Sequence, residues 1–432
     1  MDPAPRGDRL YFLDWLRVAA FGLLVLYHVG MYYVSWDWHV KSPFSTSATS
    51  ASAALEPLMQ LSSPWRLALL FLVSGVASSL MLAKRQGRFL RQRSWRLLLP
   101  LGVGMLFIVP PQSYFEVLHK FAYSGSYLDF MGLYLQGFHG FCRDGKCLAL
   151  PTWNHLWFVA YLWLYTLLLW ALNRAAPSAL DAAGGWLSRA AAARSSVRSS
   201  ARSSARSSPL WLLILPVIWL ALARVLLLDR YPSTHALVGD YYNHALYGSV
   251  FAAGAVCARA PGIWPRLAAL RWQALPVALL GWALLVLYFN HYQGSDPPAA
   301  LRQAQRVLYA SVQWCAVVAA VGFAFKHWNA DHRWRRYAVE AVFPVYILHQ
   351  TLIVLLSQAL LPLQWRPAVE GPVLVLATFA LSIAGFEALR RVAWLRPCFG
   401  LAPAQTHQSV PSLTDSDALP THAQKRPPTL GP

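Results

Sequence analysis

Long apolar segments recur along this sequence, and each is long enough to cross a lipid bilayer as a helix. A helix needs roughly 20 such residues to span about 30 Å of hydrocarbon. Ten segments satisfy this length, and the sixth is the weakest because Gly248 and Gly254 interrupt it. They predict an all-α polytopic membrane protein with about ten transmembrane helices, at residues 10–34, 60–83, 95–112, 152–174, 209–229, 241–259, 272–290, 304–325, 338–361 and 371–391.

The composition agrees with a membrane environment. The 432 residues are 56% hydrophobic and 13% charged, whereas about 25% of the residues of a typical soluble domain are charged. So apolar a chain would expose large apolar patches in water. The first segment contains Asp14, Arg17 and His28 and has no small-residue cleavage site, so it is not expected to be a signal peptide.

The formal charge of +19 is distributed as in a membrane protein. With both termini in the cytoplasm, the inner loops hold most of the lysines and arginines, and the outer loops hold far fewer. This alternation follows the positive-inside rule. It predicts an even number of helices, a multi-pass protein of the bacterial inner membrane, and no nucleic-acid partner.

One membrane domain, at residues 10–395, is expected after a short cytoplasmic N-terminus at residues 1–9. Residues 190–208 repeat an arginine followed by two serines every four residues. This composition cannot bury a core, so a flexible cytoplasmic linker is predicted. A basic helix lying on anionic lipid is the alternative. Residues 396–432 are predicted to form a disordered cytoplasmic tail.

Two long aromatic segments, at about 35–59 and 113–151, are expected as outer loops. Long ordered loops tend to carry function, and these face the compartment where a large acceptor would dock. Cys142 and Cys147 lie in the second loop, where a short disulfide hairpin is predicted. A zinc site is the alternative, but it needs further ligands, and no metal is expected.

The first predicted helix contains ionisable residues that are costly in a bilayer and are therefore functional candidates. Arg17 and His28 are eleven residues apart, which is three helical turns plus about 20°, so both point along one face. Asp14 lies one turn before Arg17 and is expected to pair with it. The alternative is an Asp–Arg anchor at the helix end and a histidine that is only hydrogen-bonded in the core.

A second candidate group lies near the inner ends of the next two helices. Arg93 and Arg96 are three residues apart and form a fork suited to phosphate. Positive-inside topology is the simpler explanation of that pair. Ser74 and Gly75 allow a ligand or another backbone to approach closely, and ordinary helix packing explains them equally well.

The remaining candidates lie near the outer start of the fourth helix, inside the ninth helix and in an outer loop. They are His155, Trp157, Tyr346, His349 and Glu116. The sequence has no Walker loop, no dinucleotide fingerprint, no His-Glu-x-x-His and no Gly-x-Ser-x-Gly run. The templates of soluble enzymes therefore do not apply.

These motifs together resemble the acyltransferase family 3 membrane proteins. The resemblance covers about residues 9–395 and rests on residues 9–17 followed by His28, an arginine and a histidine separated by ten residues. The runs that include Gly75, Arg96, Trp157 and His349 contribute as well. Within the family, residues 36–41 and 109–114 look like the branch that contains glucans biosynthesis protein C, which is assigned to succinylation of periplasmic glucans.

The resemblance implies about ten helices, an acyl-coenzyme A donor and transfer of a succinyl or acetyl group to a glycan hydroxyl. Arg93, Arg96 and Arg17 are then expected to hold coenzyme A as a co-substrate, with no bound cofactor. His28 would act as general base or carry a transient acyl group. The alternative function is a flippase or exporter of a glycan or lipid-linked sugar, because intramembrane charges also suit a transport path. No oligomeric state is indicated.

Overall fold

The computed structural model describes residues 10–45, 50–84, 86–143, 145–193 and 209–403. Within these ranges the chain forms helices and one two-stranded hairpin, so the predicted all-α class is confirmed. The elements in chain order are α1 (Tyr11–Tyr33), α2 (Ser50–Ser62), α3 (Arg66–Lys84), η1 (Gln86–Arg88), α4 (Phe89–Val103), η2 (Gly104–Ile108), α5 (Pro110–Lys120), α6 (Tyr127–Gln136), β1 (Cys142–Arg143), β2 (Lys146–Cys147), η3 (Asn154–Leu156), α7 (Trp157–Ala175), α8 (Ala179–Ala193), α9 (Trp211–Leu227), α10 (Tyr241–Asn243), η4 (His244–Gly248), α11 (Ser249–Cys257), α12 (Ile263–His291), α13 (Ala299–His327), α14 (Arg335–Leu360), η5 (Leu361–Leu363), α15 (Pro367–Arg391) and α16 (Leu395–Cys398).

Seven helices of the described chain are long and apolar enough to span a membrane, or eight if a bent pair is one span. The protein is therefore a polytopic membrane protein. The expected span at 209–229 corresponds to the 17-residue helix α9, and the one at 241–259 corresponds to the three pieces α10, η4 and α11. The count of ten spans stays a prediction.

The bent pair consists of Phe89–Ile108 and Pro110–Lys120, which meet at 44°. Pro100 cannot donate a backbone hydrogen bond within α4, and the π-helical turn η2 follows it. Two prolines then occupy the first turn of α5, where a missing N–H group costs least. The chain thus changes direction here, and α5 carries polar residues to the site described below.

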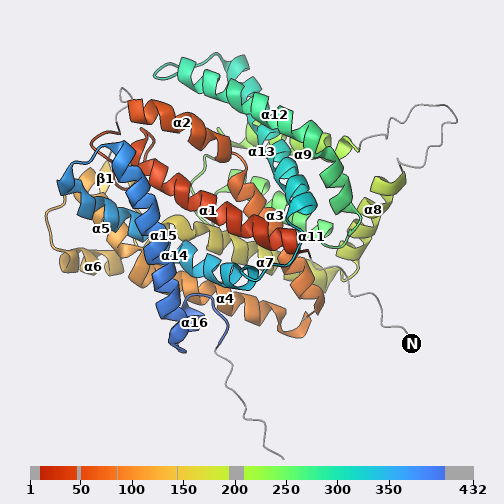
Figure 1. Ribbon diagram of the computed structural model, residues 1–432, viewed down its shortest axis with the longest axis horizontal. Coiled ribbons are helices and arrows are strands. Elements are labelled where there is room, and N and C mark those ends of the chain that lie inside the picture. Colours follow the sequence, from red (N-terminus) through yellow and green to blue (C-terminus); the bar gives the residue numbers. More distant parts are fainter. Residues whose placement is uncertain (1–9, 46–49, 85, 144, 194–208, 404–432) are drawn as a thin grey trace, which may run out of the picture.

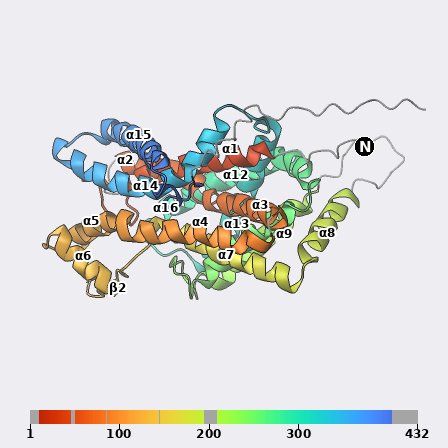
Figure 2. The same ribbon diagram turned by 90° about the horizontal axis from the view of Figure 1, so that it is seen from below.

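Helix α1 lies inside the bundle and packs against α3, α13, α14 and α15. Both views place α6 with the hairpin at one end of the molecule and α8 at the other (Figures 1 and 2). We call these the hairpin end and the α8 end. Helix α1 begins toward the α8 end and finishes toward the hairpin end, beside α2 (Figure 1).

Helices α3 and α11 approach each other at two glycines. A Cβ atom added at Gly75 would collide with the backbone carbonyl of Phe251, and one added at Gly254 would collide with the carbonyl of Leu72. Small residues allow such backbone contact between membrane helices. The close approach that the sequence predicts at Gly75 is therefore made by a neighbouring helix.

The segments expected as loops at 35–59 and 113–151 contain helices. Helix α2 lies in the first segment, and the end of α5, the helix α6 and the hairpin lie in the second. Ser126 and Asp129 form a capping box at the start of α6. The predicted disulfide joins Cys142 to Cys147 across the hairpin.

The predicted linker and tail extend less far than expected. Residues 190–193 belong to α8, and the rest of the linker lies outside the described residues. Residues 396–403 are ordered against the bundle, where Arg396 pairs with Glu340 at 3.1 Å. The remaining tail and residues 1–9 lie outside the described chain.

Candidate active site

A cavity of ≈ 560 Å³ opens among α1, α3, α5, α7 and α14. Its lining includes five of the candidates that the sequence predicts. They are His28, Glu116, His155, Trp157 and Tyr346. Cavities with a few convergent polar groups are the usual form of a ligand site. The fold therefore brings together candidates that are separated by up to three quarters of the chain.

The protonation of His28 follows from the hydrogen bonds of its neighbour His349. Nδ1 of His349 lies 2.6 Å from the carbonyl oxygen of Tyr346, and a carbonyl only accepts, so this nitrogen carries the proton. The Nε2 atom of neutral His349 then accepts a hydrogen bond from the Nδ1–H group of His28, with the two nitrogens 2.8 Å apart. Nε2 of His28 is left with a free lone pair in a cavity-lining side chain.

His155 supplies a second imidazole lone pair next to this pair. Its Nε2 atom donates to the carbonyl oxygen of Ile347 at 3.1 Å, and its buried Nδ1 atom has no hydrogen-bond partner among the described residues. The hydroxyl of Tyr346 donates to the backbone oxygen of His155 at 2.5 Å. These two contacts hold the start of α7 against α14 beside His349.

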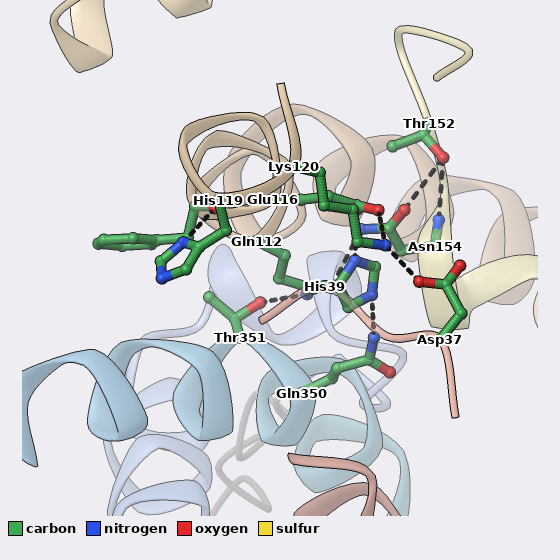
Figure 3. A network of polar contacts seen from close by, with 11 residues as sticks. Asp37, His39, Gln112, Glu116, His119, Lys120, Thr152, Asn154, Gln350 and Thr351 are labelled. Atoms are coloured by element: carbon green, nitrogen blue, oxygen red, sulfur yellow. Dashed lines mark hydrogen bonds and ion pairs between the residues drawn. The ribbon is translucent and has the colours of Figure 1, made fainter. Parts of the chain in front are cut away.

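A charged network forms the rim of the cavity around His39 (Figure 3). His39 donates from Nδ1 to a carboxylate oxygen of Glu116 at 2.5 Å and accepts from the amide of Gln350 at 2.7 Å. Lys120 bridges Glu116 and Asp37 at 2.9 and 2.8 Å. Glu116 is thus held by one cation, Lys120, and by the N–H group of the His39 imidazole. Within the described chain no group of three or more His, Cys, Asp or Glu side chains is arranged to hold a metal ion.

The network continues through amides and hydroxyls toward η3, as Figure 3 shows. Gln112 donates to Thr351 at 2.5 Å and accepts from Asn154 at 3.2 Å. Thr351 in turn donates to the carbonyl oxygen of Ile108 at 2.6 Å, at the end of η2. The break between α4 and α5 is therefore tied to α14, which carries His349, and to η3, which carries His155.

Arg66 is a buried cation on the cavity wall. It is 3% exposed, its guanidinium lies 3.8 Å from the ring centroid of Tyr27, and it donates to Ser62 at 3.0 Å. Within the described chain its Nε atom has no hydrogen-bond partner, and no carboxylate forms an ion pair with its guanidinium. A buried charge normally requires a partner. Arg66 is therefore suited to an anionic group that enters the cavity next to His28.

Three further arginines gather toward the α8 end of the bundle. Arg17 and Arg96 lie close enough to Arg93 to repel it electrostatically. Arg93 donates to Ser78 of α3 at 3.0 Å, and the Nε atoms of Arg17 and Arg93 are buried with no partner in the part of the chain that the structure describes. The structure thus brings together the fork predicted in α4 and the arginine predicted in α1. Their combined charge is suited to phosphate groups.

The other predicted candidates do not line the cavity. Asp14, which the sequence pairs with Arg17, forms an ion pair with Arg335 at 2.7 Å and so links α1 to α14. Ser74 and Gly75 lie in the middle of α3, where Gly75 contacts the backbone of Phe251 as described above.

The loop before α10 contributes His235 to the cavity lining. The ring of His235 stacks on that of Trp157, with their centroids 4.2 Å apart. Asp240 holds this loop by accepting hydrogen bonds from the backbone N–H of His235 and from the hydroxyl of Tyr161. Burial disfavours the charged carboxylate, but the hydrogen bonds, above all those from Asn243 and Tyr161, outweigh burial and lower the pKa of Asp240. The loop is therefore anchored by a charged group at neutral pH.

Sequence reasoning missed two residues that define this cavity. Arg66 lies inside the apolar segment predicted at 60–83, so a charge within an expected span was the available signal. His39 lies in the run 36–41, which contributed only to the family resemblance. Its partners are 77 and 311 residues away, and no local pattern indicates such contacts.

Comparison with known families agrees with this geometry. The sequence profile of the acyltransferase 3 family, described as an acyltransferase domain, matches residues 10–387. The match includes every helix that lines the cavity. Neither the comparison with curated proteins nor the comparison with solved structures gives a match.

Proposed function

Because the chain belongs to the acyltransferase 3 family, we propose that it transfers a succinyl or acetyl group from acyl-coenzyme A to a hydroxyl of a periplasmic or surface glycan. The protein then resides in the bacterial inner membrane, with acyl-coenzyme A as co-substrate and no bound cofactor. The resemblance of residues 36–41 and 109–114 to the glucans biosynthesis protein C branch supports a glucan acceptor. The observation that carries the proposal is the free Nε2 lone pair of His28 on the cavity wall.

His28 is the catalytic base in this reaction. Its Nε2 atom takes the proton of the acceptor hydroxyl while the hydroxyl oxygen attacks the carbonyl carbon of the thioester. A carbon–oxygen bond forms and the carbon–sulfur bond breaks, which gives an ester and the coenzyme A thiolate. The proton then passes from His28 to the thiolate, and the imidazole returns to its neutral form.

The proposed donor site is the arginine group formed by Arg17, Arg93 and Arg96. Guanidinium groups bind phosphate oxygens in a bidentate manner, and the nucleotide end of coenzyme A carries several phosphates. Arg17 and His28 are separated by about 16 Å along α1. The uncharged pantetheine arm would lie between them, so that the thioester reaches His28 while the phosphates remain at the α8 end.

The environment of Arg66 supports the succinyl group over the acetyl group. An acetyl group has no charge to offer to a buried guanidinium, whereas the terminal carboxylate of a succinyl group does. Arg66 and His28 line the same cavity. A succinyl carboxylate bound to Arg66 would therefore keep the thioester carbonyl carbon, a few bonds away, inside the cavity that His28 lines.

Release of free coenzyme A tests the proposed function. The full-length protein in lipid nanodiscs, supplied with succinyl- or acetyl-coenzyme A and a gluco-oligosaccharide, should release coenzyme A only when the glycan is present. His28→Gln should abolish the release, because an amide has no basic nitrogen. His291→Gln, which changes an exposed histidine at the end of α12, is the matched control. A flippase or exporter would move the glycan without consuming thioester, and that outcome would refute the enzyme assignment.

A further inference from the structure

A second cavity, of ≈ 770 Å³, lies beside the proposed active site. It is bounded by α2, by the segment after α1 and by the end of α12. Ser63 and Tyr309 line both cavities. The two cavities are therefore neighbours that share the wall formed by these two residues.

The wall of this cavity that α2 forms presents two unused hydrogen-bond acceptors. Glu56 is 6% exposed, and its Oε1 atom accepts from the backbone and hydroxyl of Ser35 and from the hydroxyl of Ser52. No described residue donates to its other oxygen, Oε2. Gln60 follows one turn later, on the same face of the helix, and its buried Oε1 atom also has no partner. Of these two oxygens, that of Gln60 is buried without a partner among the described residues, and a buried acceptor of this kind requires a donor from a ligand or from water.

The remaining walls combine aromatic rings with further polar groups. Trp36, Phe289 and Tyr309 line the cavity together with Glu56 and Gln60. Aromatic faces pack against the C–H groups of a sugar ring, and carboxylate and amide oxygens accept hydrogen bonds from its hydroxyls. A hydrocarbon tail would gain nothing from two unpaired acceptors. The lining therefore matches a neutral carbohydrate better than an acyl chain.

We propose that the second cavity binds the sugar ring next to the one that is acylated, so that it selects oligosaccharide acceptors. This inference rests on the proposed function, because it takes the acylated hydroxyl to lie at His28. Tyr309 and Ser63 form the boundary between the two subsites. The acceptor glycan then runs from α2 toward the cavity centre, away from the arginines that hold the donor.

Acceptor length tests the second subsite. Wild-type protein in nanodiscs, with acetyl-coenzyme A as donor, should acylate linear gluco-oligosaccharides with a higher kcat/KM than glucose. Gln60→Leu and Trp36→Leu should lower kcat/KM for the oligosaccharides about tenfold, the effect of one lost hydrogen bond or ring contact, and leave glucose unchanged. Trp365→Leu, at an exposed tryptophan outside both cavities, should change neither. An equal loss for glucose and oligosaccharides, or no preference for length in the wild type, would overturn the subsite.

A protection measurement separates the subsite from the enzymatic function. In the Gln60→Cys variant, an oligosaccharide should slow maleimide labelling of residue 60, whereas glucose at the same concentration should not. Gln364→Cys, in an exposed loop, provides the unprotected control. If an oligosaccharide protects residue 60 from maleimide but no assay detects release of coenzyme A, the sugar subsite is supported and the acyl-transfer function is refuted. Protection by phosphatidylethanolamine in the nanodisc and not by glycan would assign the cavity to a lipid headgroup and overturn the proposal.

Discussion

Among single residues, Arg66 is the clearest test of the donor, because no carboxylate of the described chain forms an ion pair with its buried guanidinium. Succinyl- and butyryl-coenzyme A have acyl chains of the same number of carbons, and only the first has a terminal carboxylate. We expect wild-type protein to prefer the succinyl donor, and Arg66→Gln to reduce that preference by about 30-fold or more, as for a lost buried charge pair. The measurement is kcat/KM for each donor with one glycan acceptor.

Arg224→Gln is the matched control for this prediction. Arg224 also packs on a tyrosine ring, that of Tyr309 at 3.6 Å, but it does not line the active-site cavity. The Arg224→Gln substitution should leave the ratio of kcat/KM for the two donors unchanged. A wild type that uses butyryl-coenzyme A equally well would refute a carboxylate site at Arg66, and so would an Arg66→Gln variant that loses both donors to the same extent.

In the proposed mechanism His349 is a positioning residue, because it contacts His28 through a 2.8 Å hydrogen bond. His349→Phe removes the acceptor for Nδ1 of His28, so the imidazole loses the hydrogen bond that fixes its tautomer and orientation. We expect kcat to fall about 10- to 100-fold, as for lost partners of functional histidines elsewhere, with little change in the KM for the donor. His349→Gln retains a carbonyl acceptor and should recover part of the activity. A purely structural role would instead lower thermal stability and kcat together in both variants.

The sequence could predict individual residues only where a local pattern exists. The eleven-residue spacing placed Arg17 and His28 on one helix face, and an arginine inside an apolar segment was visible at Arg66. The bond from His28 to His349 spans 321 residues of sequence. No periodicity encodes such a pair, so the tautomer of His28 follows from the fold alone.

At the scale of elements, the contact of α3 with α11 depends on glycine. Gly75→Ala would force a methyl group against the carbonyl of Phe251, and we expect a loss of about 1–3 kcal/mol, as for other overpacked positions. Gly102→Ala in α4 is the control, because nothing lies within 4 Å of the added Cβ. The measurement is the thermal unfolding midpoint in detergent. A midpoint as high for Gly75→Ala as for the wild type would mean that the two helices separate without cost.

Elements were predictable where their length in lipid is fixed, and less so elsewhere. A span of about 20 apolar residues has few alternatives, so the long helices appear where the sequence placed them. Helices α2 and α6 are short and lie in segments with many polar residues. The sequence of such segments is equally compatible with loops. The capping pair Ser126 and Asp129 was a usable signal for α6. The break at Pro110 was readable as a doubled proline, although the 44° bend was not.

At the scale of the whole molecule, the proposed donor and acceptor sites lie at different depths in the bundle. Helix α1 begins toward the α8 end and finishes toward the hairpin end (Figure 1), and Arg17 lies near its start whereas His28, which lines the cavity, lies near its end. The disulfide between Cys142 and Cys147 also lies at the hairpin end. Disulfides persist in the periplasm and not in the bacterial cytoplasm. This supports an orientation in which the glycan reaches His28 from the periplasm and coenzyme A binds from the cytoplasm.

Such an orientation makes the reaction vectorial, and sealed vesicles test it. In inside-out membrane vesicles, donor added outside should acylate a glycan trapped in the lumen, because the thioester reaches His28 about 16 Å along α1 from the arginines that hold its phosphates. Free coenzyme A should appear outside and the ester inside, as measured by mass spectrometry of the separated fractions. Vesicles with His28→Gln should give neither product, and permeabilised wild-type vesicles should reach the same yield as sealed ones. Acylation that occurs only when donor and glycan share the outer solution would refute the cross-membrane geometry and leave the acyltransferase assignment in place.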